Sequence, residues 1–360
     1  MPSYQNTKSI LGSDEAAFNA LVAHQLTEFN DDSITEVGQY GFYKQTTLQS
    51  IYLPKCKTIG NNAFSDCTAL QRIFIGLDNS TVTTCGNSVF LNTGRSIIYV
   101  PDELVSNYRS ASNWSAYAGR IFGVSSAATG ENEWNETEIT DTPEQIASYV
   151  SAGTAASRYK VGQYKTIDLG TEGQIRMQIV GKNCRELANS TDTAQLDWLA
   201  MDLLKTKHKM NDALNGTTAG TCAIGPMTAE YNSMQAYLDT TIWALVPTVW
   251  QNMIKEAKQI TYSYNTSGTS VTNDITTSKL RIPSYREVNL GSKETQGPVY
   301  GLAFPDNNSR KRMIVGSTSA TTWWLRSAGN TNNFYCVYTS GNSNYSDANN
   351  EYGVALEFST

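Results

Sequence analysis

A 22-residue repeat in the N-terminal third restricts the fold of this chain more than any other feature. The apolar positions of one copy recur in the next, each displaced by 22 residues: Val37, Phe42, Leu48, Ile51 and Leu53, followed by Ile59, Phe64, Leu70, Ile73 and Ile75. A third copy, with a shifted spacing that predicts an insertion in its loop, comprises Gly86, Val89, Phe90, Ile98 and Val100. Repeats of this length and pattern predict a leucine-rich solenoid in which every copy adds one short strand. About three copies are needed before such a core closes, so these three meet the minimum.

The segments on either side of the repeats are expected to cap and to link them. Residues 13–30 carry apolar side chains at helical spacing after Ser13, which predicts an amphipathic helix within an N-terminal cap of residues 1–32. Residues 125–160 are rich in small and acidic residues and are interpreted as a linker. Within it, Thr142 and Pro143 mark the expected start of a short helix, because proline fits the first helical turn.

The sequences of the repeats also resemble a known repeat family. The stretch IGNNAFSDCTALQRIFI, followed by IIYVPDELVSNYRSASNWSAYAGRI, resembles BspA-type leucine-rich repeats with their terminal helical cap, over residues 33–124. The resemblance implies a role in surface adhesion and spacing, without catalysis. The alternative is that so short an array serves only as a stalk or scaffold.

Composition excludes several classes of function. The 360 residues include 27 basic and 33 acidic side chains, a net charge of −6, and no Lys/Arg run, so we expect no nucleic-acid binding. No apolar stretch approaches the roughly 18 residues of a membrane span, and the first residues lack the layout of a secretory signal, so we expect no membrane insertion. Two histidines, His24 and His208, and six scattered cysteines cannot assemble a zinc site.

Residues 161–360 read as a second domain of mixed strands and helices, so the predicted fold class is α+β. Alternating apolar and polar residues over 160–181, around a glycine-containing turn, predict a β-hairpin. Apolar spacing predicts one helix over 194–210 and a second helical region over 233–260, which Pro247 divides. The stretch LRIPSYREV predicts a strand, then a short helix with a capping box of Ser284 and Glu287.

The chain ends in two apolar strand-like stretches, TTWWLRSA and EYGVALEF, that enclose the polar segment 329–350. This segment is dominated by Asn, Tyr, Ser, Thr, Asp and Gly, so it is expected to be a mostly exposed loop. A loop of that length in a compact domain is typically functional or disordered. Tyrosine supplies rigid contact area and Ser, Gly and Asn supply adaptable hydrogen bonds, as in antibody paratopes, which indicates recognition.

The order of motifs across residues 160–360 resembles a family of C-type-lectin-like domains from gut bacteria and their phages. The motifs are GQYKTIDLG, HKMNDALN, SMQAYLDTTIWALVPTVWQNMI, KLRIPSYREV, GPVYGLAFPDNNSRKR, WWLRSA and GVALEF. These domains are similar to the formylglycine-generating-enzyme variant of the lectin fold, and some are variable proteins of diversity-generating retroelements, in which Asn codons at a C-terminal binding surface are diversified. The chain lacks the Glu-Pro-Asn and Trp-Asn-Asp triplets of calcium-dependent lectins, and Cys336 has no reactive partner nearby in the sequence. We therefore expect no calcium, no other metal, no cofactor, and an incidental role for Cys336.

The resemblance implies a non-enzymatic receptor-binding protein, a phage virion adhesin of a tail or head fibre whose diversified loops bind a host surface protein or glycan. The expected partners also include other virion proteins and further copies of the chain, with a trimer as the working assumption. The expected location is the virion surface, with a bacterial cell surface as the alternative. Two other functions stay open: a structural head-fibre or decoration protein, and a surface-glycan hydrolase using carboxylates among Asp347, Glu351 and Glu357. The predicted ligand-binding residues are Asn330, Asn332, Asn333, Phe334, Tyr335, Tyr338, Asn342, Asn344, Tyr345, Asn349 and Asn350.

Overall fold

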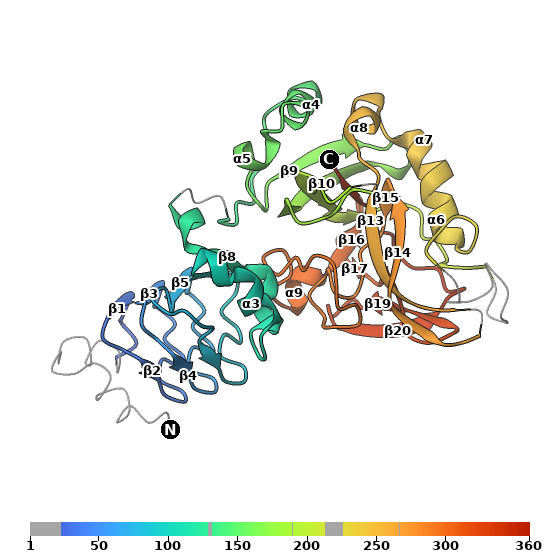
Figure 1. Ribbon diagram of the computed structural model, residues 1–360. Coiled ribbons are helices and arrows are strands. Elements are labelled where there is room, and N and C mark those ends of the chain that lie inside the picture. The colour runs from blue at the N-terminus through green and yellow to red at the C-terminus, as the bar shows by residue number, and fades with distance from the viewer. Residues whose placement is uncertain (1–22, 129–131, 189, 213–225, 266) are drawn as a thin grey trace. The chain divides into compact units, whose positions relative to one another are not determined.

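The computed structural model describes residues 23–128, 132–188, 190–212, 226–265 and 267–360. The chain forms two compact units, Met1–Glu133 and Trp134–Thr360, of mixed strand and helix content (Figure 1). Each unit has its own hydrophobic core.

The first unit is the predicted solenoid of repeats. Its long side is a five-stranded parallel sheet in chain order, made of β1 (Glu28–Asn30), β3 (Ser50–Leu53), β5 (Arg72–Ile75), β7 (Ile97–Val100) and β8 (Ile121–Gly123). A second parallel sheet contains β2 (Glu36–Val37), β4 (Thr58–Ile59) and β6 (Thr84–Cys85). Ile51 pairs with Ile73, and Ile73 pairs with Ile98, so the two predicted copies and the shifted third copy are confirmed.

A column of phenylalanines runs through the core of the first unit. Phe42, Phe64 and Phe90 hold the same place in successive copies, and all three are buried. The Phe64 ring centroid lies 5.1 Å from that of Phe42 and 5.5 Å from that of Phe90, with interplanar angles of 18° and 3°. The copied position therefore stacks on itself along the solenoid. We call these three residues the phenylalanine column.

A helical cap closes the far end of the solenoid core. It contains η1 (Asp102–Leu104), α3 (Val105–Ser110), η2 (Ser115–Arg120) and η3 (Val124–Ala127). The Trp114 ring lies 5.9 Å from Phe90 and 5.0 Å from Tyr108, and its indole N–H donates to the carbonyl of Thr83 at 2.6 Å. These buried aromatic rings shield the last copy from water.

The predicted N-terminal helix, 13–30, is wrong at its C-terminal end, and its residues 13–22 lie outside the described residues. Phe29 belongs to β1 and pairs with Ile51. Its ring lies 5.0 Å from Phe42, so Phe29 begins the aromatic packing of the first copy. Pairing with β3 satisfies backbone N–H and C=O groups of this segment. It also covers the edge of β3, which would stay unpaired if the same residues formed a helix.

The second unit is built on a five-stranded sheet in the order β15-β21-β11-β10-β9. The predicted hairpin is confirmed as β9 (Tyr164–Asp168) and β10 (Gln174–Lys182), which pair antiparallel around η4 (Gly170–Glu172). The sheet is completed by β11 (Leu196–Ala200), β15 (Leu280–Arg281) and β21 (Glu357–Ser359). Thus β21, the last strand in the sequence, lies inside the sheet between β15 and β11.

The predicted helix over 194–210 is wrong, because this segment forms β11 and then β12 (Asp202–Leu203). Every residue of β11 is buried, including Asp197 and Trp198. A strand covered on both faces carries apolar residues continuously, and such a run also contains the spacing of a helix. In the folded unit this segment pairs with β10 and β21, and that pairing makes it a strand.

The predicted helical region over 233–260 is confirmed up to Met253. It consists of α6 (Ser233–Tyr237), η5 (Leu238–Ile242, a π-helical turn), α7 (Trp243–Leu245) and α8 (Thr248–Met253). Pro247 stands immediately before α8, as its position in the sequence predicts. Residues from Ala257 belong to a strand instead, β13 (Ala257–Tyr264), which pairs with β14 (Ser270–Ser278).

Much of the segment interpreted as a linker, 125–160, is ordered structure. It contains α4 (Pro143–Ser151) and α5 (Ala155–Arg158). Thr142 and Gln145 form a capping box at the start of α4, so the predicted helix start is confirmed. Ile139 and Ile146 are buried in the core of the second unit, which is why that unit begins at Trp134.

Three smaller elements complete the second unit. One sheet contains β12, β16 (Arg312–Ile314) and β17 (Ala320–Thr321), preceded by α9 (Asn307–Arg310). Another contains β18 (Trp323–Ala328), β19 (Asn333–Val337) and β20 (Ser343–Asp347). The predicted capping box exists, since Ser284 N donates to Glu287 Oε2 at 2.7 Å and Glu287 N donates to Ser284 Oγ at 3.2 Å, but it closes a turn rather than a helix.

A buried cluster of charges joins the second unit's segments. Its members are fully or almost fully buried, namely Arg185, Arg281, Arg326, Asp197, Glu287 and Glu357. Arg185 Nη2 lies 2.6 Å from Glu287 Oε1 and 2.5 Å from Glu357 Oε1, and the Tyr300 hydroxyl donates to Glu357 at 2.9 Å. Burial raises the pKa of Glu287, but the guanidinium groups of Arg185 and Arg326 outweigh it and hold that pKa well below its usual value. We call these six residues the charge cluster.

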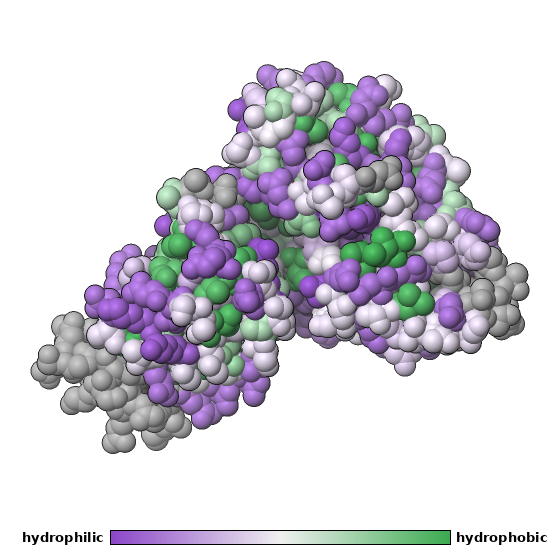
Figure 2. Space-filling view, viewed as in Figure 1, coloured by the Kyte–Doolittle hydropathy of each residue, from purple (hydrophilic) through white to green (hydrophobic). Residues whose placement is uncertain are grey.

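On the face that Figure 2 shows, both units are mostly polar, with some apolar patches. The large apolar or aromatic side chains that are exposed include Tyr52 and Tyr345. In the described parts of the chain, no helix has the length and apolar character needed to cross a bilayer. Among those residues there is also no group of three or more His, Cys, Asp or Glu side chains arranged to hold a metal ion.

Candidate ligand-binding surface

The polar segment 329–350 is a β-hairpin, so the expectation of a mostly exposed loop is wrong. Its strands β19 and β20 pair antiparallel with Tyr335 opposite Tyr345, and β19 also pairs with β18. Phe334 and Cys336 point into the core of the unit and are buried. Alternation along β19 therefore gives the hairpin one core face and one outer face, although apolar residues are few.

Four of the predicted binding residues are exposed, six are half-buried and one is buried. The exposed ones are Asn332, Asn342, Asn344 and Tyr345, and the half-buried ones are Asn330, Asn333, Tyr335, Tyr338, Asn349 and Asn350. Phe334 is a core residue and cannot contact a ligand in this conformation. The expectation that Cys336 is a loop residue is also wrong, because it lies on β19, is packed in the core, and burial raises its thiol pKa to about 12.

Most of the hairpin's asparagines bond to the hairpin itself or to its neighbours. Asn330 Oδ1 accepts the N–H groups of Asn332 and Asn333, at 2.8 and 3.0 Å. Asn333 Nδ2 donates to Asp347 Oδ1 at 2.6 Å, and Asn344 Oδ1 accepts the N–H of Tyr345 at 2.9 Å. These amides shape turns and strand edges, which is a common use of asparagine.

The hairpin tip is fixed against α9. Asn307 Nδ2 donates to Asn342 Oδ1 at 2.6 Å. Gly341 has a φ of +84°, and a Cβ added there would collide with the carbonyl oxygen of Asn307. Only glycine accommodates both the left-handed backbone and this close approach. The tip is therefore positioned by the scaffold.

Tyrosines from three segments gather on the outer face of the hairpin around one lysine. We call this group the tyrosine face, and it comprises Tyr262, Tyr264, Tyr285, Lys293, Tyr335 and Tyr345. The Tyr335 ring lies 4.5 Å from that of Tyr285 and 6.0 Å from that of Tyr345. The ring centroids of Tyr262 and Tyr264 lie 5.7 Å apart on β13, which contacts β18.

The local structure explains why the rings meet. The tip bond from Tyr338 N to Asn342 O makes Tyr335 and Tyr345 a non-hydrogen-bonded pair, in which facing side chains lie closest. A Cβ at Gly329 would lie 2.6 Å from the Cβ of Tyr345, so the glycine leaves room for that side chain. The Tyr285 hydroxyl accepts from Ser343 Oγ at 3.4 Å, which connects the turn after β15 to β20.

Lys293 places a positive charge among these rings. Its Nζ lies 5.1 Å from the centroid of Tyr262 and 5.3 Å from that of Tyr335, within the range of cation–π attraction. Burial lowers the pKa of Lys293, but its interactions with Tyr335, Tyr262 and Tyr285 outweigh burial and raise the pKa above its usual value. No carboxylate of the described residues forms an ion pair with it. The neighbouring Glu294 turns inward, accepting the N–H groups of Tyr262 and Arg286 at 3.0 and 3.2 Å.

The carboxylates considered for glycan hydrolysis lie in unlike surroundings. Glu357 is buried in the charge cluster, whereas Asp347 and Glu351 are exposed. Asp347 accepts the hydrogen bond from Asn333 and lies on the outer face, two residues beyond Tyr345. Glu357 is thus engaged with arginines and closed off from solvent.

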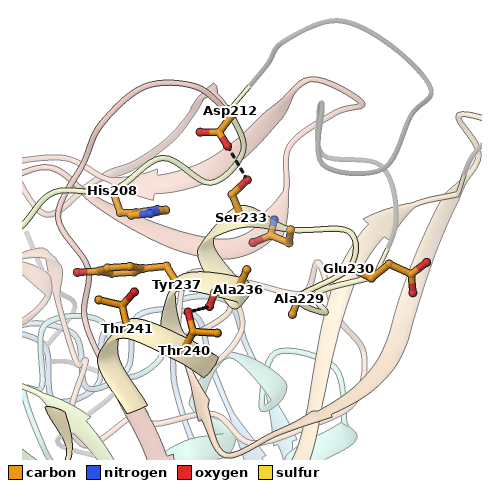
Figure 3. A pocket seen from close by; sticks show the side chains of 10 residues that line it. His208, Asp212, Ala229, Glu230, Ser233, Ala236, Tyr237, Thr240 and Thr241 are labelled. Carbon is orange, nitrogen blue, oxygen red and sulfur yellow. Dashed lines mark hydrogen bonds between the residues drawn. The ribbon is translucent and has the colours of Figure 1, made fainter. Parts of the chain in front are cut away.

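A separate pocket of about 390 Å³ lies beside α6 and η5 (Figure 3). The His208 and Tyr237 rings lie face to face at its edge, 4.2 Å apart, and Asp212 accepts a hydrogen bond from Ser233 Oγ at 3.3 Å. Part of its wall is the π-helical turn of η5, a local geometry frequent at functional sites. None of the binding residues predicted from the sequence lies in this pocket.

Sequence reasoning found the hairpin tyrosines but missed Tyr262, Tyr264, Tyr285 and Lys293. These residues precede the hairpin by several dozen positions, and only the folded sheet brings them to it. The clearest available signal was the alternation in AKQITYSY, which places both tyrosines of β13 on one face. Nothing in the sequence around Lys293 sets it apart from the other lysines.

Comparisons with known proteins agree with this division of the chain. Residues 5–114 match the BspA type Leucine rich repeat region, in six copies, and residues 221–357 match a Domain of unknown function (DUF6273). No curated protein and no solved structure matches the chain. The N-terminal region therefore consists of BspA-type leucine-rich repeats, as its motifs and its parallel strands indicate.

Proposed function

We propose that this chain is a non-enzymatic binding protein whose tyrosine face contacts a molecule on a cell surface. The observation that carries the proposal is the exposure of Tyr345, 50% of whose surface is open to water above the packed Tyr335 ring. Aromatic side chains on a rigid base lose little entropy on binding and are frequent hot spots of interfaces. The hairpin that presents them is held by β18 on one side and by α9 at its tip.

The finer parts of this proposal come from the resemblances of the sequence. The second unit is proposed to be a C-type-lectin-like domain of a phage virion adhesin, mounted on the repeats, with a bacterial surface location as the alternative. Two features of the second unit support this proposal. Strand β21 lies inside the five-stranded sheet, between β15 and β11, and the hairpin belongs to a separate sheet of β18, β19 and β20. Under this proposal, diversification would affect outward residues such as Asn332, Asn342, Asn344 and Tyr345, while Phe334 and Cys336 stay constant.

The first experiment compares two exposed tyrosines, one from each unit. Tyr345→Ala removes the exposed ring of the tyrosine face, and Tyr52→Ala removes a ring of β3 in the repeats that is 40% exposed. Fluorescently labelled protein is added to a panel of intact gut bacterial isolates, and binding is measured by flow cytometry. We expect Tyr345→Ala to weaken binding about 30-fold, the equivalent of a hot spot of about 2 kcal/mol, and Tyr52→Ala to leave it unchanged. Equal binding by wild type and Tyr345→Ala would refute the proposal.

The second experiment tests diversification directly. The 3′ part of the gene, from the Trp323 codon onward, is sequenced in many copies from its native population. We expect differences to concentrate at outward positions of 329–350 and to spare the codons of Trp324, Phe334 and Phe358. A uniform hairpin sequence would remove the retroelement from the proposal and leave a binding protein of fixed specificity.

A further inference from the structure

We propose that the tyrosine face binds an acidic glycan, with Lys293 holding a sugar carboxylate while the tyrosine rings cover the sugar's apolar faces. The inference rests on the proposed function, since it names the ligand class of the same surface. It depends on the position of one ammonium group among aromatic rings and on the absence of an ion pair to it within the described residues.

The charge of Lys293 is available to a ligand. Its ammonium has three N–H donors and lies 5.1 Å from the centroid of the Tyr262 ring and 5.3 Å from that of the Tyr335 ring. The rings of Tyr262 and Tyr335 attract the cation without neutralising it. The ammonium thus keeps its positive charge and can donate to the oxygens of a carboxylate, and hydrogen bonds between charged groups are stronger than neutral ones.

The surroundings favour a sugar over a peptide strand. A peptide that extended the sheet would need the outer edge of β20, where the N–H of Tyr345 is already bonded to the Asn344 side chain. Recognition therefore falls to side chains. The outer face offers tyrosine rings for the C–H face of a pyranose, together with hydroxyl groups of Ser343 and the tyrosines for its hydroxyls.

One acidic group on the same face opposes an anion and supplies a second test. Asp347 stands two residues beyond Tyr345, and its carboxylate is held by Asn333. Removing its charge should strengthen the binding of an acidic sugar, because the repulsion disappears while the side chain keeps nearly the same shape. The opposite signs expected for Lys293 and Asp347 make the inference demanding.

The experiment uses the full chain and immobilised polysaccharides, polygalacturonate and polysialic acid as acidic probes and dextran as a neutral one, with biolayer interferometry as the readout. We expect wild type to prefer an acidic probe at least tenfold over dextran. Lys293→Gln should lose that preference, Lys293→Arg should keep most of it, and Asp347→Asn should increase affinity severalfold. Raising the salt concentration should weaken only the acidic-probe binding. Unchanged thermal midpoints check that the variants fold.

The failures are distinguishable. If wild type binds cells through Tyr345 but Lys293→Gln binds all probes as wild type does, the acidic-glycan inference falls and the proposed function stands. If polyglutamate binds at this surface and both acidic glycans do not, the ligand is an acidic peptide and the inference is also overturned. If Tyr345→Ala leaves cell binding intact, the proposed function itself fails, and the inference fails with it.

Discussion

Replacing Phe64 by leucine should loosen the whole repeat unit. The ring is fully buried in the middle of the phenylalanine column, with one stacked neighbour at 5.1 Å and the other at 5.5 Å. Leucine keeps most of the apolar volume but loses both ring contacts, each of which contributes about 0.5–1.5 kcal/mol beyond burial. The expected loss of unfolding free energy is therefore about 1–3 kcal/mol. Because each copy contacts only its neighbours, a weak middle copy weakens both sides.

Amide hydrogen exchange followed by mass spectrometry measures this effect segment by segment. A loss of about 1–3 kcal/mol corresponds to exchange about 5- to 150-fold faster in β3, β5 and β7. Phe74→Leu is the matched control, since Phe74 lies in the same copy on the half-exposed face and also has a ring on each side, Tyr52 at 5.9 Å and Tyr99 at 4.9 Å. We expect it to accelerate exchange less, because Phe74 is half-exposed and its replacement leaves no buried gap, whereas leucine at the fully buried Phe64 site does. We expect β11 of the second unit to be unaffected by either change. Equal effects of the two substitutions would refute the argument that burial of the column stabilises the solenoid.

Three further predictions concern the second unit and the thiols. Glu287→Gln should lower the unfolding free energy by about 3–5 kcal/mol at pH 7, because it leaves two buried guanidinium groups short of a counter-charge. Folding lowers the pKa of Glu287, so the stabilisation from its carboxylate is fully present above the unfolded-state pKa of about 4.3 and is lost progressively as the pH falls from there toward the folded-state pKa. Urea midpoints should therefore drop in acid for wild type and drop less for the variant. Gly341→Ala should weaken binding and destabilise the folded hairpin tip by about 1–3 kcal/mol, which faster amide exchange in β20 would show. Gly316 also has a positive φ but has open space around it, so Gly316→Ala should leave the exchange in β20 unchanged. Iodoacetamide at pH 8, followed by peptide mapping, should label the exposed Cys184 long before the buried thiols of Cys56, Cys67, Cys85 and Cys336. Burial raises the pKa of these four thiols to about 11 or 12, so rapid labelling of one of the four would contradict the structure.

Those parts of the fold that repeat, or in which a residue such as proline marks the start of a helix, could be predicted from the sequence. The spacing of Phe42, Phe64 and Phe90 reports a column because neighbouring copies pack in register. Pro143 and Pro247 mark helix starts through their own backbone chemistry. Such signals depend on a few adjacent residues and need no knowledge of the rest of the chain.

The errors occur where distant segments decide. Residues 194–210 carry a helical spacing, yet β10 and β21 claim Leu196–Ala200 as a buried strand. In 329–350, Phe334 and Cys336 alternate with polar residues over too short a run to stand out among so many asparagines. The candidate site divides in the same way, since Tyr335 and Tyr345 were found by composition, whereas Lys293 reaches them only through the folding of the sheet.

The interior position of β21 has a consequence for how the second unit is made. A ribosome delivers residues 357–359 after β9, β10, β11 and the hairpin, so the nascent sheet stays open, and Arg185 and Arg281 wait without the carboxylate of Glu357. A frameshift or stop codon anywhere in 329–350 would remove that strand and that charge together. Completion of the sheet therefore depends on correct translation through residues 329–350: changes of sequence there leave the unit intact only if the reading frame continues through β21.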